Sequence, residues 1–124
     1  MPMQRALGIG GIFFKARDPK ALAEWYRVHL GIEVEPWGGA VFKWHGGEST
    51  VWSPFPADTT YFGKAPQGFM VNFRVGDLRA LVAELKAAGC DVDERVEETE
   101  QGVFGWVSDP EGNRVELWQP AAGH

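Results

Sequence analysis

The hydrophobic residues of the chain follow two periods, one typical of strands and one typical of helices. Residues 8–17 form a short apolar stretch rich in Ile and Phe, which predicts a strand. Asp18 and Pro19 follow it, an N-cap residue and a Pro at the first helical position. Apolar residues then recur at helical spacing up to a glycine typical of a C-terminal cap, namely Leu22, Trp25, Tyr26, Leu30 and Gly31. The pattern predicts a strand followed by a helix.

The same pattern returns 59 residues later, where Met70–Asp77 aligns with Gly11–Asp18 and Phe73 with Phe14. After each helix three short strands are predicted, at 32–37, 39–45 and 49–56 and again at 90–95, 102–108 and 113–119. The last two strands are separated by the turn Asp109-Pro-Glu-Gly112, and His45-Gly-Gly47 has the same place in the first copy. The sequence therefore predicts one domain over 1–124 with two tandem βαβββ modules, 8–56 and 69–119, and a linker at 57–68.

Strand alternation assigns the side chains of each predicted strand to two faces. The more uniformly apolar set is expected beneath the helices and consists of Ile12, Phe14, Val71 and Phe73. The opposite face is expected to form a concave surface lined by Phe13, Trp52, Asn72, Glu116 and Trp118. Large aromatic side chains with a few polar groups on a concave surface are typical of small-molecule sites. The predicted fold class is α+β, a cupped mixed β-sheet with the helices on its outer face.

Composition narrows the class of partner. The 124 residues carry 12 Lys and Arg against 17 Asp and Glu, a net charge of −5, which argues against nucleic acid and anionic membranes as partners. No apolar run approaches the roughly 18–20 residues that span a bilayer, and the first residues lack the apolar stretch of a signal peptide. The single Cys cannot form an internal disulfide, so we expect a cytoplasmic protein.

Two motifs in the two halves carry a family resemblance: Asp18-Pro-Lys-Ala-Leu-Ala-Glu-Trp-Tyr26, followed by Leu30-Gly31, and Asp109-Pro-Glu-Gly-Asn-Arg-Val-Glu-Leu-Trp118. Over about residues 8–119 the chain resembles the vicinal oxygen chelate (VOC) superfamily, which includes glyoxalase I, bleomycin-resistance proteins, extradiol dioxygenases and methylmalonyl-CoA epimerase. The resemblance implies a homodimer. In active members it also implies a divalent metal, held by side chains on the first and last strands of each half.

Carried over to this sequence, the four metal-ligand positions of the family fall on Gly11, Thr50, Met70 and Glu116. Glycine has no donor atom, a thioether matches these metals poorly, and a threonine hydroxyl is a weak ligand. One carboxylate alone does not hold a catalytic metal. We therefore expect a protein with no metal and no other cofactor.

The repeat also aligns Trp44 with Trp106 at an offset of 62 residues, and Trp52 with Trp118 at an offset of 66. These tryptophans are interpreted either as an aromatic cage for a ligand or as packing and dimer contacts. The residues expected to bind a ligand are Phe13, Thr50, Trp52, Met70, Asn72, Trp106, Glu116 and Trp118.

Three functions remain open from the sequence. The first is binding of a small, largely apolar or aromatic molecule without a metal, as in the bleomycin-resistance proteins. The alternative is a glyoxalase-like lyase or isomerase with Glu116 as general base, with or without a divalent metal. Glu116 has a plainer interpretation as a strand residue paired with a nearby Arg. The third function is a purely structural or partner-binding domain, so the sequence leaves open whether the protein is an enzyme.

Overall fold

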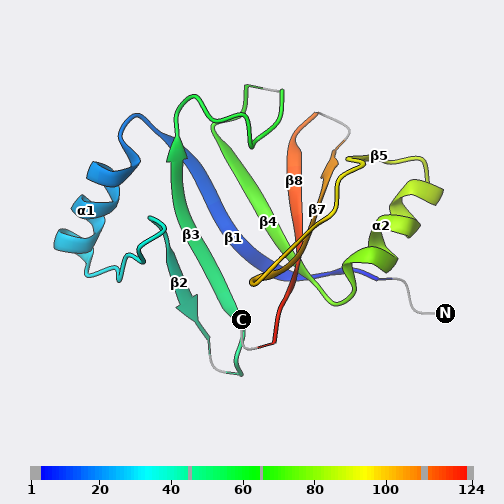
Figure 1. Cartoon of the computed structure of the whole chain (residues 1–124), viewed down its shortest axis with the longest axis horizontal. Coiled ribbons are helices and arrows are strands. Elements are labelled where there is room, and N and C mark those ends of the chain that lie inside the picture. The colour runs from blue at the N-terminus through cyan, green and yellow to red at the C-terminus, as the bar shows by residue number, and fades with distance from the viewer. Residues whose placement is uncertain (1–3, 45, 65, 110–111, 123–124) are drawn as a thin grey trace.

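The computed structural model describes residues 4–44, 46–64, 66–109 and 112–122. It is a mixed sheet of eight strands with two helices, and the α+β class is as predicted (Figure 1). The elements are β1 (Ala6–Ala16), α1 (Pro19–Leu30), β2 (Ala40–Lys43), β3 (Ser49–Pro56), β4 (Phe69–Val75), α2 (Leu78–Ala87), β5 (Asp91–Val92), β6 (Glu97–Thr99), β7 (Gly102–Ser108) and β8 (Arg114–Pro120).

The two halves of the sheet meet at its centre. Along the sheet the strand order is β2-β3-β1-β4-β8-β7-β5, and β6 pairs with β7. The first strands of the two modules, β1 and β4, are antiparallel to each other, and each has the last strand of its own module, β3 or β8, as a parallel neighbour. Side chains from the last strands of both modules therefore lie close to the centre of one face.

Both helices begin as the sequence predicts. The side chain of Asp18 accepts a hydrogen bond from the amide of Ala21 at 3.1 Å, and Asp77 accepts one from Ala80 at the same distance. These bonds satisfy amide groups that have no partner within the helix. At the other end, Gly31 takes the left-handed conformation with φ of 68°.

The helices pack on the two flanks of the sheet, α1 beside β3 and α2 beside β5 (Figure 1). Helix α2 covers β5, β7 and β8 over an apolar cluster of Val75, Leu78, Leu81, Val82, Val103 and Leu117. Helix α1 packs on β3 and β1, where the ring centroids of Tyr26 and Trp52 lie 4.9 Å apart. Neither helix covers the centre of the sheet, so Ile12 remains 41% exposed although it was expected beneath a helix.

The strand expected at 32–37 is absent, which corrects the sequence interpretation. In its place the amide of Gly38 donates to the carbonyl of Glu35 at 2.9 Å, and the amide of Glu35 donates to Gly39 at 2.7 Å. Pro36 has no amide hydrogen to donate and Gly38 has a positive φ of 102°, so this segment turns rather than pairing with a strand. The expected strand 39–45 is shortened to Ala40–Lys43.

Strands within the second module also differ from the predicted bounds. The strand expected at 90–95 is reduced to β5, and the pairing of β6 with β7 was not predicted. Asp109 and Gly112 close the last turn, since the amide of Gly112 donates to the carbonyl of Asp109 at 2.9 Å. The two central residues of this turn lie outside the described residues, as does His45 in the turn predicted for the first module.

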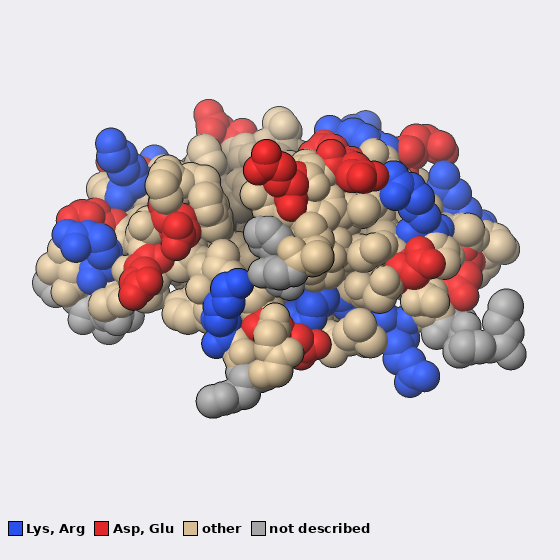
Figure 2. All heavy atoms as spheres, turned by 60° about the horizontal axis from the view of Figure 1, so that its bottom comes forward, with Lys and Arg blue, Asp and Glu red and all other residues tan. Residues whose placement is uncertain are grey.

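The surface carries both signs of charge. On the face shown in Figure 2, Lys and Arg side chains lie interspersed with Asp and Glu side chains. Several form exposed ion pairs, such as Arg79 with Glu98 at 3.2 Å. Among the described residues, no helix is long and apolar enough to cross a membrane.

Candidate functional site

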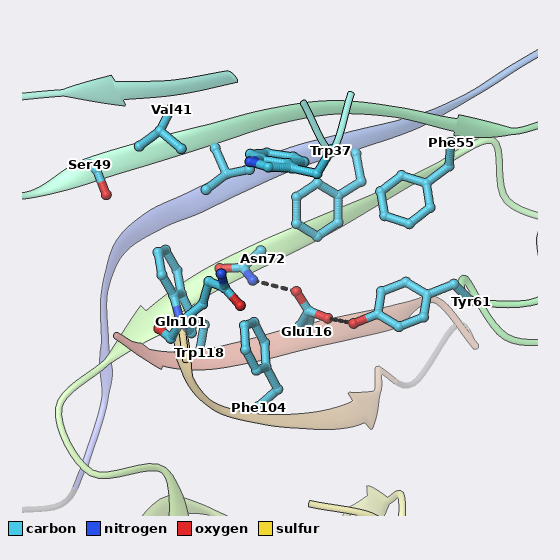
Figure 3. Close-up of a pocket in the computed structure, with 12 residues that line it drawn as sticks. Trp37, Val41, Ser49, Phe55, Tyr61, Asn72, Gln101, Phe104, Glu116 and Trp118 are labelled. Atoms are coloured by element: carbon cyan, nitrogen blue, oxygen red, sulfur yellow. Dashed lines mark hydrogen bonds between the residues drawn. The ribbon is translucent and has the colours of Figure 1, made fainter. Parts of the chain in front are cut away.

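A cavity of about 430 Å³ lies on the face of the sheet opposite the helices, in the size range of small-molecule sites (Figure 3). First-module side chains such as Trp37, Val41 and Phe55 form one wall, and Phe104 and Trp118 of the second module form the other. The full lining is Phe13, Trp37, Val41, Ser49, Val51, Phe55, Tyr61, Asn72, Gln101, Phe104, Glu116 and Trp118. Most of this surface is aromatic or aliphatic.

The register of β7 and β8 builds the aromatic wall. Phe104 lies opposite Trp118 in this antiparallel pair, and their rings stack with centroids 6.1 Å apart and planes 8° apart. Directly opposite side chains of an antiparallel pair lie on the same face of the sheet. Two residues farther along, Trp106 lies opposite Glu116 on that face. Alternation thus gives β8 a polar and an aromatic residue in the same cavity.

Glu116 is the buried polar centre of the site, with 1% of its surface exposed. Its Oε1 accepts a hydrogen bond from Asn72 Nδ2 at 2.6 Å. Its Oε2 accepts one from Trp106 Nε1 at 3.0 Å and another from the hydroxyl of Tyr61. Strand register explains two of these contacts, because Glu116 has Asn72 beside it on β4 and Trp106 beside it on β7. Three donors therefore hold one carboxyl group.

Burial dominates the electrostatics of this group. It raises the pKa of Glu116, and the hydrogen bonds from Tyr61, Asn72 and Trp106, with the positive charge of Arg114, only partly offset it. Burial and the neighbouring Glu116 also raise the pKa of Tyr61, so the phenol keeps its proton and remains a donor. At a given pH, Glu116 is therefore protonated to a greater extent than an exposed glutamate.

A bulge in β1 makes room for Asn72. Ile9 lies opposite Phe73 and Gly11 opposite Asn72, so Gly10 is an extra residue on β1. A Cβ atom added at Gly10 would overlap Asn72 Oδ1 and lie 3.0 Å from Cε3 of Trp118. Glycine at this position therefore allows the Asn72 amide to lie against β1 and reach Glu116.

The residues around Glu116 do not fit a divalent metal. Strand register places Gly11, Val51 and Asn72 abreast of Glu116, whereas Thr50 and Met70 lie at other register positions. Gly11 and Val51 offer no side-chain donor atom, and Asn72 turns its NH2 group toward the carboxyl group. In the described part of the chain, no group of three or more His, Cys, Asp or Glu residues is placed to hold a metal ion.

The expected ligand-binding residues fall into three places. Phe13, Asn72, Glu116 and Trp118 line the cavity, as the alternation predicts. Met70 and Trp106 are fully buried beneath it, in an aromatic cluster with Phe13 and Phe62. Thr50 and Trp52 do not line it: the hydroxyl of Thr50 donates to the carbonyl of Ile9, and Trp52 packs on α1. The expectation that Trp52 lies on the concave face was wrong.

Strand register explains this error. Phe14 of β1 lies beside Pro54 of β3, and its repeat counterpart Phe73 of β4 lies beside Leu117 of β8. The last strands of the two modules are thus related by an offset of 63 residues, whereas the alignment of the two tryptophans used 66. Side chains alternate between the two faces of a strand. An alignment that uses the even offset of 66 in place of the odd offset of 63 therefore assigns Trp52 to the wrong face.

Several cavity residues were missed by the sequence analysis. Trp37 was placed in a strand, and Tyr61 in the linker 57–68, although an aromatic pair at Tyr61 and Phe62 is unusual for a solvated linker. Phe62 is fully buried and Tyr61 bonds Glu116. Strict alternation along β3 would have found Val51 and Phe55, which have the parity of the buried Ser49 and Ser53. The other cavity residues missed are Val41, Ser49, Gln101 and Phe104.

Comparison with solved structures shows the same fold in proteins of distant sequence. A methylmalonyl-CoA epimerase in complex with methylmalonyl-CoA and NH4+ is 20% identical, with a TM-score of 0.73 over 97% of this chain and 99% of that one. The Mycobacterium tuberculosis methylmalonyl-CoA epimerase is 21% identical, with a TM-score of 0.65 over 98% and 93%. A glyoxalase/bleomycin resistance protein/dioxygenase superfamily member from Vibrio splendidus 12B01 is 14% identical, with a TM-score of 0.58 over 94% and 99%.

Sequence comparison supplies the family. No curated protein matches the chain at a significant level. The model of the glyoxalase-like domain matches residues 11–118, which include most of both modules and all the cavity residues named above. The chain therefore belongs to the glyoxalase-like domain family.

Proposed function

We propose that this protein binds a small, largely apolar or aromatic molecule in its cavity without a metal. The observation that carries the proposal is the cavity of about 430 Å³ between the stacked rings of Phe104 and Trp118 and the first-module wall. Such a wall favours a flat ring through burial of apolar surface and through stacking. The donor set around Glu116 supports binding without a metal, since Gly11 and Val51 have no side-chain donor atom and Asn72 turns its NH2 group toward the carboxyl group.

A second candidate is a lyase or isomerase with Glu116 as the general base. It is favoured by one specific observation, a carboxyl group of raised pKa beside a cavity, because such a group exchanges protons closer to neutral pH. The hydrogen bonds count against it. Tyr61 and Trp106 occupy both acceptor positions of Oε2 and Asn72 occupies one on Oε1, so a single position on a buried oxygen is left for a substrate proton. We therefore prefer the binding function.

Assembly and location belong to the same proposal. Strand β2 is the edge of the sheet and carries the exposed Phe42, an apolar edge suited to pairing with a second copy. We expect a homodimer that forms through this edge. We expect the protein in the cytoplasm, because the one cysteine of the chain forms no internal disulfide. Size-exclusion chromatography with light scattering tests the dimer, and a monomeric mass at micromolar concentration contradicts it.

The binding function is tested by titrating the protein with 2-naphthol while its tryptophan fluorescence is recorded. Val41 and Phe42 are neighbours on β2, but Val41 lines the cavity and Phe42 does not. We expect Val41→Lys to weaken binding about tenfold or more, because it places a charge against an apolar ligand. The matched variant Phe42→Lys is expected to leave the affinity within about twofold of the wild type. Absence of saturable binding, or equal effects of both variants, contradicts the proposal.

A further inference from the structure

Arg74 is a buried cation beside the cavity that the site described above does not use. It lies on β4, two residues from Asn72, and therefore on the same face of the sheet. Only 4% of its surface is exposed, and its guanidinium lies 4.8 Å from the ring centre of Trp44. Its Nη1 donates to the main-chain carbonyl of Ser49 at 2.8 Å.

The remaining donors of this guanidinium are unsatisfied. Nε and Nη2 of Arg74 have no hydrogen-bond partner within the described residues. The nearest carboxylate is that of the half-exposed Glu48, whose Oε1 lies 3.4 Å from Nη2, an ion-pair contact outside good hydrogen-bond geometry. Leaving a buried charged donor unpaired is unfavourable, so such a group is explained best by a partner that arrives from outside.

The two free atoms define the chemistry of that partner. Nε and Nη2 lie on one edge of the planar guanidinium, and their parallel N–H groups match the two oxygens of a carboxylate. Ser49 adds a third donor, because its hydroxyl is buried, has no partner in the described part of the chain, and lines the cavity. In Figure 3 this hydroxyl points from β3 toward the interior of the cavity.

Arg74 does not line the cavity itself, but two residues beside it do. Ser49 accepts the hydrogen bond from Nη1, and Trp118 lies beside Arg74 through the pairing of β4 with β8. Asn72 Oδ1, the other unpartnered atom on the wall, is an acceptor and does not suit an anion. An anionic group is thus directed to the Ser49 end, away from Glu116.

We propose that the Nε–Nη2 edge of Arg74 and the hydroxyl of Ser49 form a carboxylate subsite, so that the ligand is an aromatic or apolar acid. The proposal rests on the proposed binding function and specifies its ligand class. The apolar body of the acid lies between the aromatic walls, and its carboxylate replaces the weak contact between Glu48 and Arg74. Glu48 is then a competitor for the subsite rather than part of it.

The test compares two probes of the same shape, 2-naphthoate and the neutral 2-naphthamide, by isothermal titration calorimetry at pH 7. We expect the wild type to bind the acid about tenfold more tightly than the amide, as a bidentate charged contact implies. Arg74→Gln is expected to reduce this preference to about twofold or less. Arg79→Gln, which removes an exposed cation on α2, is the matched control and is expected to keep the preference.

Two further variants leave Arg74 in place and keep the proposal testable if Arg74→Gln does not fold. Glu48→Gln is expected to strengthen 2-naphthoate binding about threefold, because it removes the competing carboxylate. Ser49→Ala is expected to weaken it by a similar factor. Equal affinity of the wild type for both probes overturns the carboxylate subsite and leaves the binding function intact. Absence of binding of both probes overturns the binding function as well.

Discussion

The hydroxyl of Tyr61 donates a hydrogen bond to the carboxyl group of Glu116, which joins the segment between the two modules to the last strand of the sheet. The two residues are 55 positions apart in the chain. Through this bond the connecting segment becomes part of the cavity wall, and its neighbour Phe62 is fully buried beneath the cavity. The segment 57–68 thus contributes to the site as well as connecting the modules.

Removing this hydroxyl is expected to destabilise the protein. Tyr61→Phe leaves a buried carboxyl group with one donor fewer, which costs about 1–3 kcal/mol in the free energy of unfolding. Tyr26→Phe is the matched control, because the hydroxyl of Tyr26 has no hydrogen bond within the described residues, and its effect is expected below about 0.5 kcal/mol. Urea unfolding of the two variants measures both values, and equal stabilities show that the bond to Glu116 contributes nothing.

Stability is expected to depend on pH through Glu116. Its pKa in the folded state is raised above the ordinary value of 4.5, so unfolding releases a proton between these two values. The stabilising contribution of the protonated form is complete below about pH 4.5 and is lost as the pH rises through the raised pKa. Glu116→Gln does not titrate, so its stability relative to the wild type is expected to increase with pH.

The check on this prediction is urea unfolding of both proteins at several values between about pH 4.5 and pH 8. Other titrating groups act in both proteins, so the difference between the two curves isolates Glu116. A difference that stays constant over this range shows that the pKa of Glu116 is not raised.

The bulge at Gly10 is expected to tolerate no side chain. Gly10→Ala places a Cβ atom where the Asn72 amide lies, so Asn72 must leave Glu116. We expect a loss of about 1–3 kcal/mol in stability together with weaker binding of 2-naphthol. Gly68→Ala is the control, because a Cβ there meets no atom within 4 Å and no positive φ is required. Equal effects of the two substitutions would show that the space at Gly10 is not needed.

Divalent metals are expected to leave the protein unchanged. Glu116 offers its two oxygens to three protein donors, and Gly11 and Val51 beside it have no side-chain donor atoms. Adding Zn²⁺ or Ni²⁺ at micromolar concentration is therefore expected to shift the midpoint of thermal unfolding by less than about 1 °C, since a ligand that does not bind the folded state does not stabilise it. Elemental analysis of the purified protein provides the second reading, and one metal ion per chain refutes this expectation.

The sequence predicts which segments form helices and strands better than it predicts on which face of the sheet each side chain lies. Cap residues such as Asp18 and Asp77 act locally, and both form the expected hydrogen bonds. The faces depend on register between strands that are far apart in the chain, and a repeat alignment with gaps does not determine it. An alignment that is wrong by an odd number of residues puts Trp52 in the cavity, whereas the structure packs it on α1.

Local sequence patterns predict only some of the cavity residues, because the others are brought there by contacts between distant segments. Phe13, Asn72, Glu116 and Trp118 were found because alternation alone assigns them to the concave face. Tyr61 reaches Glu116 from a segment with no regular period, so only the folded chain shows the contact. The unpartnered edge of Arg74 likewise emerges only from the packing of β4 against Ser49.

The central claim is that the cavity between the two modules binds an aromatic molecule without a metal. The most direct measurement is a crystal structure of the protein treated with EDTA and soaked with 2-naphthol. We expect electron density for one naphthol ring between Val41 and Phe104, with the hydrogen bonds of Glu116 to Tyr61 and Asn72 retained. An empty cavity with the ligand bound elsewhere, or a metal ion on the Glu116 carboxylate, would contradict it.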